Sequence, residues 1–121
     1  MSFPVEIWLR GDNHATTVTV EAPAGPPQAW TEGDVTDVLT AMLRAIDRAK
    51  HPEAEANRPV SLRGFSWIVN PFDGGVVIAL EMTLGAVVAG PFDVAEEALT
   101  GLISRAVAPA VASAPWPATV H

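Results

Sequence analysis

The chain has 121 residues, which fits a single domain large enough to bury a core of its own. It contains no cysteine, and this excludes a disulfide-built scaffold and a thiolate metal site. Its 14 acidic and 7 basic residues give a net charge of −7, which argues against a nucleic-acid partner. We assign residues 1–112 to one domain and residues 113–121 to a Pro/Ala-rich C-terminal tail.

The N-terminal segment and the most apolar run bear on the location of the protein. Residues 1–6 contain neither a basic stretch nor a long apolar stretch, so a signal peptide is not expected. The apolar run from Val76 to Gly90 is too short to span a bilayer and carries Glu81 near its middle. We therefore predict a cytoplasmic protein without a membrane partner.

The N-terminal residues predict a β-hairpin. Residues 4–10 alternate, with Val5, Ile7 and Leu9 on one face and Glu6, Trp8 and Arg10 on the other. Residues 11–13 are typical of a turn, and residues 16–21 alternate again and are rich in β-branched side chains. The Pro-rich residues 22–28 cannot continue a strand, so they are expected to form a connecting loop.

A helix is predicted to follow this loop. Thr31 is placed to cap its N-terminus, with Asp34 as the capping-box partner, and Pro52 ends it. Its apolar side chains recur at helical spacing and should form a buried stripe: Val35, Val38, Leu39, Met42, Ile46 and Ala49.

The second half of the chain predicts further strands. Residues 60–70 form one, with Trp67 on the inner face and Ile68 on the outer face. Asp73-Gly74 predicts a hairpin turn within a loop longer than two residues. Residues 76–84 form the next strand, with Val76, Ile78, Leu80, Met82 and Leu84 facing inward. Gly85 then marks a bulge or a bend, after which residues 86–89 extend this strand or form a short fifth one.

A second helix is predicted before the tail. Asp93 and Glu96 form an N-terminal capping pattern, and Pro109 stops the helix. Its buried stripe consists of Val94, Leu99, Leu102, Ile103, Ala106 and Val107.

These elements predict an α+β two-layer sandwich in the order ββαββα. The sheet is expected to be antiparallel, with four strands, or five if residues 86–89 form their own, and with both helices on one face. The helix starts resemble each other, and Leu9-Arg10-Gly11 recurs as Leu62-Arg63-Gly64. We therefore hypothesise an internal duplication of a ββα unit, against the alternative that any two capped amphipathic helices look alike.

Catalytic, cofactor and metal motifs are not apparent in the sequence. His14, His51 and His121 are too scattered to predict a metal site, and no nucleophile motif or nucleotide-binding glycine pattern occurs. We therefore predict no catalytic residue, metal or cofactor, and no enzyme class is indicated. Glu81, in the middle of an apolar strand, is expected to be solvated on the open face of the sheet. The alternatives are that it pairs there with Arg10 or Arg63, or that it lies in a small pocket.

Two surfaces are candidates for binding. The open face of the sheet should carry Trp8, Arg10 and Glu81, and it is more apolar than a solvated face usually is. It is expected to pack against a second subunit, unless Trp8 simply lies flat over its small neighbours. In the tail, Pro115, Trp116 and Pro117 favour an extended segment with one aromatic anchor, which either folds back or docks on another chain.

The leading functional hypothesis is a non-catalytic protein-interaction or assembly module. It would act as an accessory subunit, with another protein as its partner, or as a self-associating homo-oligomer. One alternative is a small-molecule-binding protein, with a pocket between the sheet and residues 22–30 lined by Trp30, Trp67 and Phe72. Another is an acidic inhibitor or immunity-type protein that masks a basic partner.

Overall fold

The computed structural model of the protein describes residues 1–53, 60, 62 and 64–111, of which residues 108–111 are described by their backbone alone. It contains a five-stranded antiparallel sheet, two α-helices and a short 3-10 helix. In chain order these are β1 (Ser2–Leu9), β2 (Thr16–Glu21), η1 (Pro27–Ala29), α1 (Glu32–Lys50), β3 (Ser66–Phe72), β4 (Gly75–Met82), β5 (Gly85–Phe92) and α2 (Glu96–Val111). The predicted α+β class and ββαββα-like order are confirmed, with the fifth strand present.

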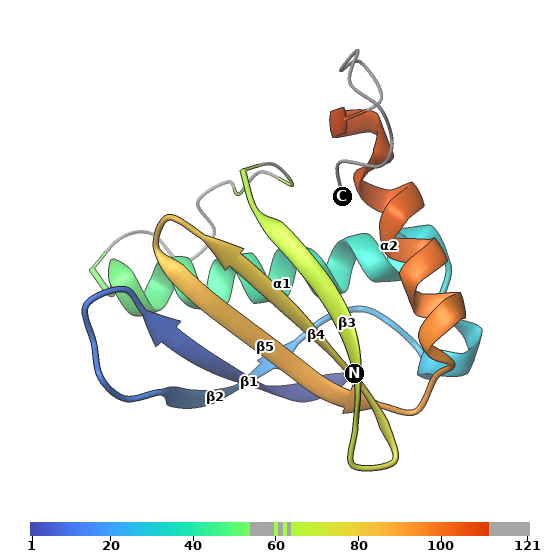
Figure 1. The fold of residues 1–121 in the computed structure, drawn as a ribbon, viewed down its shortest axis with the longest axis horizontal. Coiled ribbons are helices and arrows are strands. Elements are labelled where there is room, and N and C mark those ends of the chain that lie inside the picture. The colour runs from blue at the N-terminus through green and yellow to red at the C-terminus, as the bar shows by residue number, and fades with distance from the viewer. Residues whose placement is uncertain (54–59, 61, 63, 112–121) are drawn as a thin grey trace.

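The strands are arranged in the order β2-β1-β5-β4-β3, and every neighbouring pair is antiparallel. Helix α1 follows the edge strand β2 and crosses behind the sheet, so that the chain re-enters at the opposite edge as β3 (Figure 1). Helix α1 packs on β1, β2 and β5, while α2 packs on α1 and β3. The two helices thus cover one face of the sheet and leave the other face open.

The core lies between this helix layer and the sheet. Alternate residues of the inner strands are buried, including Val5, Ile78, Leu80 and Val87, as the period of a strand requires. Helix α1 contributes a stripe in which Val35, Val38, Leu39, Met42 and Ile46 are buried, as predicted. Among the described side chains none that is polar or charged is buried, so the core is built entirely from apolar groups.

The predicted start of α1 is confirmed, whereas that of α2 is wrong. The backbone N–H of Asp34 donates to Thr31 Oγ1 at 3.2 Å, and that of Thr31 donates to Asp34 Oδ2 at 3.0 Å, which completes a capping box. Helix α2 begins at Glu96, and the Asp93 carboxylate instead accepts a hydrogen bond from Gln28 Nε2 at 2.8 Å. Helix α2 also extends beyond Pro109, to Val111.

The hairpin between β3 and β4 differs from the prediction at its turn. Strand β3 begins at Ser66 rather than at residue 60, and it continues through Pro71 to Phe72; residues 61 and 63 lie outside the described part. Phe72 pairs with Gly75, so the loop has only the two residues Asp73 and Gly74. Their φ angles of 51° and 84° are both positive, as a type I′ turn requires. The expectation of a longer loop is therefore wrong.

The segment after β4 is a fifth strand, as one of the two alternatives predicted, and it is longer than residues 86–89. Met82 pairs with Gly85 across a tight turn, so the predicted strand over residues 76–84 ends two residues early. Strand β5 then runs to Phe92 and pairs with β1 on its other side. Val76 lies opposite Phe92 and Ile78 opposite Ala89, which leaves residues 90 and 91 facing Val77 alone. This bulge accommodates Pro91, which has no N–H for a regular ladder.

The connectivity of the two halves does not support an internal duplication. Helix α1 follows an edge strand, whereas α2 follows β5, which lies inside the sheet next to β1. Leu9 ends strand β1, but Leu62 and Gly64 precede strand β3, and Arg63 lies outside the described residues. The sequence matches between the halves therefore fall at different places in the fold.

Candidate functional site

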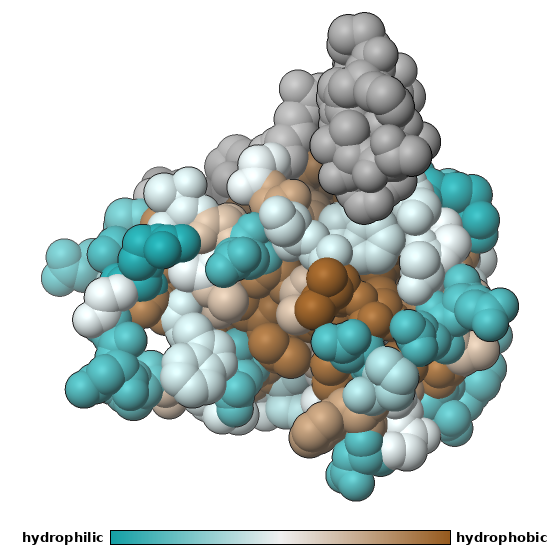
Figure 2. Space-filling model, in the orientation of Figure 1, coloured by the Kyte–Doolittle hydropathy of each residue, from teal (hydrophilic) through white to brown (hydrophobic). Residues whose placement is uncertain are grey.

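The open face of the sheet carries a shallow apolar trough that runs along β4 and β5. Its floor consists of the smaller residues of these two inner strands, namely Val77, Ala79, Ala86, Val88 and Gly90. Its walls are large side chains on the flanking strands: Trp8 on β1, and Ile68 and Phe72 on β3, which are 43%, 53% and 59% exposed. Figure 2 shows apolar residues gathered in the middle of this face, with hydrophilic residues around them.

The strand register brings the walls and the floor together. One row across the sheet runs from Glu6 through Val88 and Ala79 to Ile68. The neighbouring row runs from Trp8 through Ala86 and Glu81 to Ser66. Because directly paired residues of an antiparallel sheet share a face, these side chains form one continuous surface.

Two hollows lie along the trough, and each combines apolar lining with one glutamate. The first, of about 280 Å³, is lined by Glu6, Phe72, Val77 and Val88 together with their neighbours. The second, of about 250 Å³, is lined by Ile68, Ala79, Glu81 and Ala86 with theirs. Both hollows open onto the same face of the sheet, so an elongated group could occupy them together.

Trp8 is positioned by a residue of its own strand. Its indole Nε1 donates to Glu6 Oε1 at 2.9 Å, and both side chains stand on the open face because they are two residues apart on β1. Trp8 thus lies on the open face of the sheet, as the alternation in the sequence predicted. Glu6 was not singled out as a binding residue, although its place two residues before Trp8 already put it on the same face.

Arg10 and Glu81 lie near each other but do not pair. The guanidinium of Arg10 donates through Nε to the carbonyl oxygen of Thr83 at 3.0 Å and through Nη2 to that of Met82 at 3.3 Å. Both Arg10 and Glu81 line a broad hollow of about 610 Å³ at the end of the sheet. The alternative of an Arg10–Glu81 ion pair is therefore wrong, because the turn between β4 and β5 occupies the arginine, whereas the leading expectation of an exposed Glu81 on the open face agrees with the structure. Within the described residues Glu81 is exposed and has no hydrogen-bond or ion-pair partner; Arg63 lies outside them.

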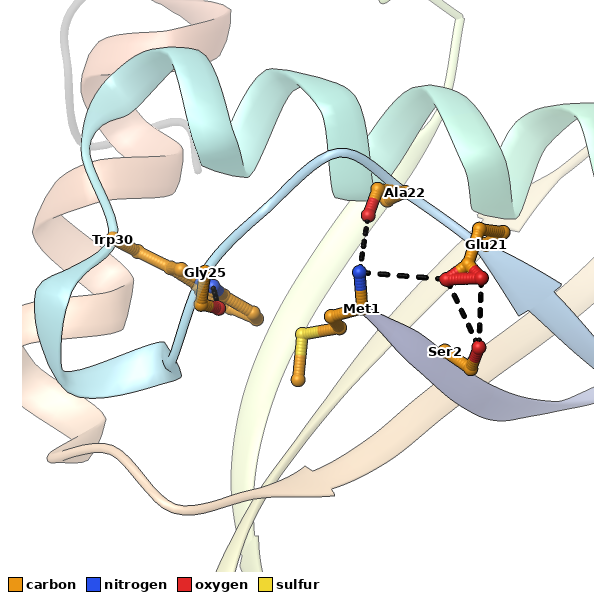
Figure 3. A network of polar contacts seen from close by, with 6 residues as sticks. All are labelled: Met1, Ser2, Glu21, Ala22, Gly25 and Trp30. Atoms are coloured by element: carbon orange, nitrogen blue, oxygen red, sulfur yellow. Dashed lines mark hydrogen bonds and ion pairs between the residues drawn. The ribbon is translucent and has the colours of Figure 1, made fainter.

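The three aromatic residues expected to line one pocket do not face a common space. Trp30 is buried, its Nε1 donates to the carbonyl oxygen of Gly25 at 2.8 Å (Figure 3), and its ring packs edge-on against Phe92. Trp67 is half-buried and packs against the core. Phe72 stands on the opposite face of the sheet, in the wall of the trough.

A polar network joins β1 to the end of β2 (Figure 3). Ser2 Oγ lies 2.8 and 2.9 Å from the two carboxylate oxygens of Glu21, which share the single hydrogen that the hydroxyl donates. The N-terminal ammonium group donates to the carbonyl oxygen of Ala22 at 2.7 Å and lies 3.4 Å from Glu21 Oε2. The Ser2 hydroxyl, and after it the ammonium group, lower the pKa of the Glu21 carboxyl below its ordinary value.

Removing the Ser2 hydroxyl should raise the pKa of Glu21. Because the folded-state pKa is lowered, the stabilisation from this network is present above the unfolded-state pKa and is lost as the pH falls through the folded-state pKa. In the Ser2→Ala variant the folded-state pKa should lie closer to the unfolded-state value, so this stabilisation should be smaller. An NMR titration of the Glu21 side-chain carboxyl carbon would show the rise in its pKa. Ser66→Ala, an exposed serine on β3, is the matched control and should leave the Glu21 titration unchanged.

Three of the predicted binding residues, Pro115, Trp116 and Pro117, lie outside the described residues. Within the described part of the chain, no group of three His, Asp or Glu side chains could hold a metal ion. Nor does any helix there have both the length and the apolar character needed to cross a membrane.

Comparison with known proteins gave no match to a family model, to a curated protein or to a solved structure. The geometry of the open face is therefore the basis for the functional proposal.

Proposed function

We propose that the protein is an interaction module, an accessory or assembly component that binds another polypeptide in the trough on the open face of its sheet. The observation that carries this proposal is the exposure of Trp8, Ile68 and Phe72 around one continuous apolar floor. Contiguous apolar surface of this kind marks interaction sites on folded proteins. Aromatic side chains that stand above such a surface are typical anchors of protein interfaces.

The shape of the site favours a polypeptide over an enclosed small ligand. Small-molecule pockets bury most of the ligand and converge a few polar groups on it. The two hollows of the trough are instead shallow and lie side by side along two strands. A ligand that filled both would have to be elongated and would keep one side in solvent, as a docked protein segment does.

A selection experiment tests this function without assuming the chemistry of the partner. Immobilised wild-type protein is used to enrich binders from a random-sequence peptide display library. The binding of each enriched peptide is then compared for wild type, Ile68→Ala and Val18→Ala. Val18 is the matched control, since it is an exposed apolar residue, 37% exposed, that pairs with Val5 on the other face of the sheet.

We expect enriched peptides whose affinity falls about tenfold or more in Ile68→Ala and hardly changes in Val18→Ala, because interface anchors carry a large share of the binding energy. Peptides that bind all three proteins equally would show that the trough is not the site. A selection that enriches no peptide would equally count against the proposal.

A further inference from the structure

Charge is distributed unevenly between the two layers of the molecule. The five strands of the sheet contain no lysine or arginine, and their charged residues are all glutamates: Glu6, Glu21 and Glu81. All three stand on the open face, since Glu21 pairs with Ser2 and the other two line the trough. Of the basic residues in the described part, Arg44, Arg48, Lys50 and Arg105 belong to the helices. The remaining one, Arg10, lies just after β1, and its guanidinium is held by the turn between β4 and β5.

Two of the three glutamates are placed to meet a partner. Glu21 is already bound by Ser2 and by the N-terminal ammonium group. Glu6 is exposed and accepts from Trp8 through Oε1 only, and Glu81 is exposed and has no polar partner within the described residues. Glu6 is on the wall strand β1, whereas Glu81 is on the floor strand β4, close to its end. The apolar trough thus has one carboxylate in its β1 wall and another at one end of its floor.

The dimensions of the trough fit a helix. From the β1 wall to the β3 wall there are three strand spacings, or about 14 Å, and an α-helix with its side chains is about 10–12 Å across. Strands β4 and β5 have 8 residues each, which at about 3.3 Å per residue gives a floor of about 26 Å, the length of roughly 17 helical residues. The small floor residues, above all Ala79, Ala86 and Gly90, let a cylinder approach the sheet closely.

We infer that the partner is a basic amphipathic α-helix of another protein, which lies along β4 and β5 with its apolar stripe on the trough floor and with Lys or Arg side chains beside Glu6 and Glu81. The inference rests on the proposed function and adds the chemistry of the ligand. A second copy of the chain fits less well, because face-to-face packing would bring two sets of these glutamates together. Like charges that face each other across an interface oppose association.

Three synthetic peptides of about 17 residues, labelled with fluorescein, test this inference. The first is an amphipathic helix with a Leu/Ala stripe flanked by lysines. The second replaces every lysine by glutamate. The third keeps the composition of the first but carries a central Pro-Pro pair, which prevents a continuous helix. Affinity is measured by fluorescence anisotropy at low and at high salt.

We expect the affinity of the lysine helix to be at least about tenfold higher than that of either of the other peptides. Its affinity should fall with added salt, because the flanking charge pairs are exposed. The double variant Glu6→Gln/Glu81→Gln should weaken it about threefold to tenfold and reduce its salt dependence. Glu97→Gln, an exposed residue of α2, is the matched control and should leave the affinity unchanged.

Several results would overturn the inference of a basic helical partner. Each of them can be told apart from a failure of the proposed interaction function. Equal binding of the broken peptide would show that the ligand is extended, and equal binding of the glutamate helix would remove the role of charge. A dimer in light scattering that dissociates in Ile68→Ala would identify a second copy as the occupant. In each of these cases, selected peptides that still lose affinity in Ile68→Ala would leave the interaction function standing.

Discussion

Replacing Gly85 by alanine should lower the free energy of unfolding by about 2–4 kcal/mol, because the change combines overpacking with backbone strain. Gly85 opens β5 and pairs with Leu9 of β1. A Cβ atom there would lie 2.0 Å from the carbonyl oxygen of Trp8 and 3.0 Å from the backbone nitrogen of Arg10. Its φ angle of +143° also lies in a region that L-residues rarely adopt. Since the obstructing atoms belong to the backbone at the end of β1, relief requires β1 and β5 to separate there.

Urea denaturation followed by circular dichroism would measure this loss, with Gly33→Ala as its control. Gly33 lies in the first turn of α1, where a Cβ atom would meet only Thr31 Oγ1, at the ordinary contact distance of 3.6 Å. The helical backbone there should tolerate alanine, so the control is expected to be unchanged or stabilised by up to about 1 kcal/mol. Equal stabilities of the two variants would contradict the close approach of β1 and β5 at Gly85.

Much of the fold could be predicted because its local patterns agree with its tertiary contacts. The alternation at Val5 and Ile7 and the helical spacing at Val35, Leu39 and Met42 each indicate one buried face, and each of these residues is buried. The capping box at Thr31 and Asp34 is a purely local feature, so the start of α1 followed directly from the sequence. Asp93 and Glu96 have the same spacing, but Gln28 from a distant loop engages Asp93, and no local pattern could indicate that contact.

The strand ends were mispredicted where prolines occur, since proline is a strand breaker only in a regular inner ladder. Pro71 is tolerated because β3 is an edge strand, and Pro91 because it sits in a bulge opposite Val77. Neither circumstance can be recognised before the strand order is known. The order itself depends on the crossover of α1 from one edge of the sheet to the other, which is a long-range property of the chain.

The mispredicted end of β3 also concealed part of the candidate site. Trp8, Glu81 and Ile68 were placed on the open face by alternation alone, and the structure has them there. Phe72 was assigned to a pocket with Trp30, because the predicted strand ended before Pro71. Once β3 continues to its two-residue turn, alternation from Ile68 places Phe72 on the open face as well.

Truncating Phe92 to alanine should cost about 3–5 kcal/mol of unfolding free energy, a large part of the stability of a domain of this size. Phe92 is 3% exposed, and its ring packs edge-on against Phe3, at 5.4 Å between centroids, and against Trp30, at 5.0 Å. These contacts join the end of β5 to the first strand and to the residue that precedes the cap of α1. The alanine would therefore leave a cavity where three separate segments meet.

Phe72→Ala makes the same chemical change on the open face and serves as the matched control. Phe72 is 59% exposed, so its truncation should alter the unfolding free energy by no more than about 0.5 kcal/mol. If Phe92→Ala does not fold, Phe92→Leu should still show a measurable loss in urea, because leucine fills part of the same space. A Phe72→Ala variant as unstable as Phe92→Ala would mean that Phe72 is part of the core and not of the trough. A stable Phe72→Ala variant that has lost peptide affinity would instead separate the residues that hold the fold together from those that bind its partner.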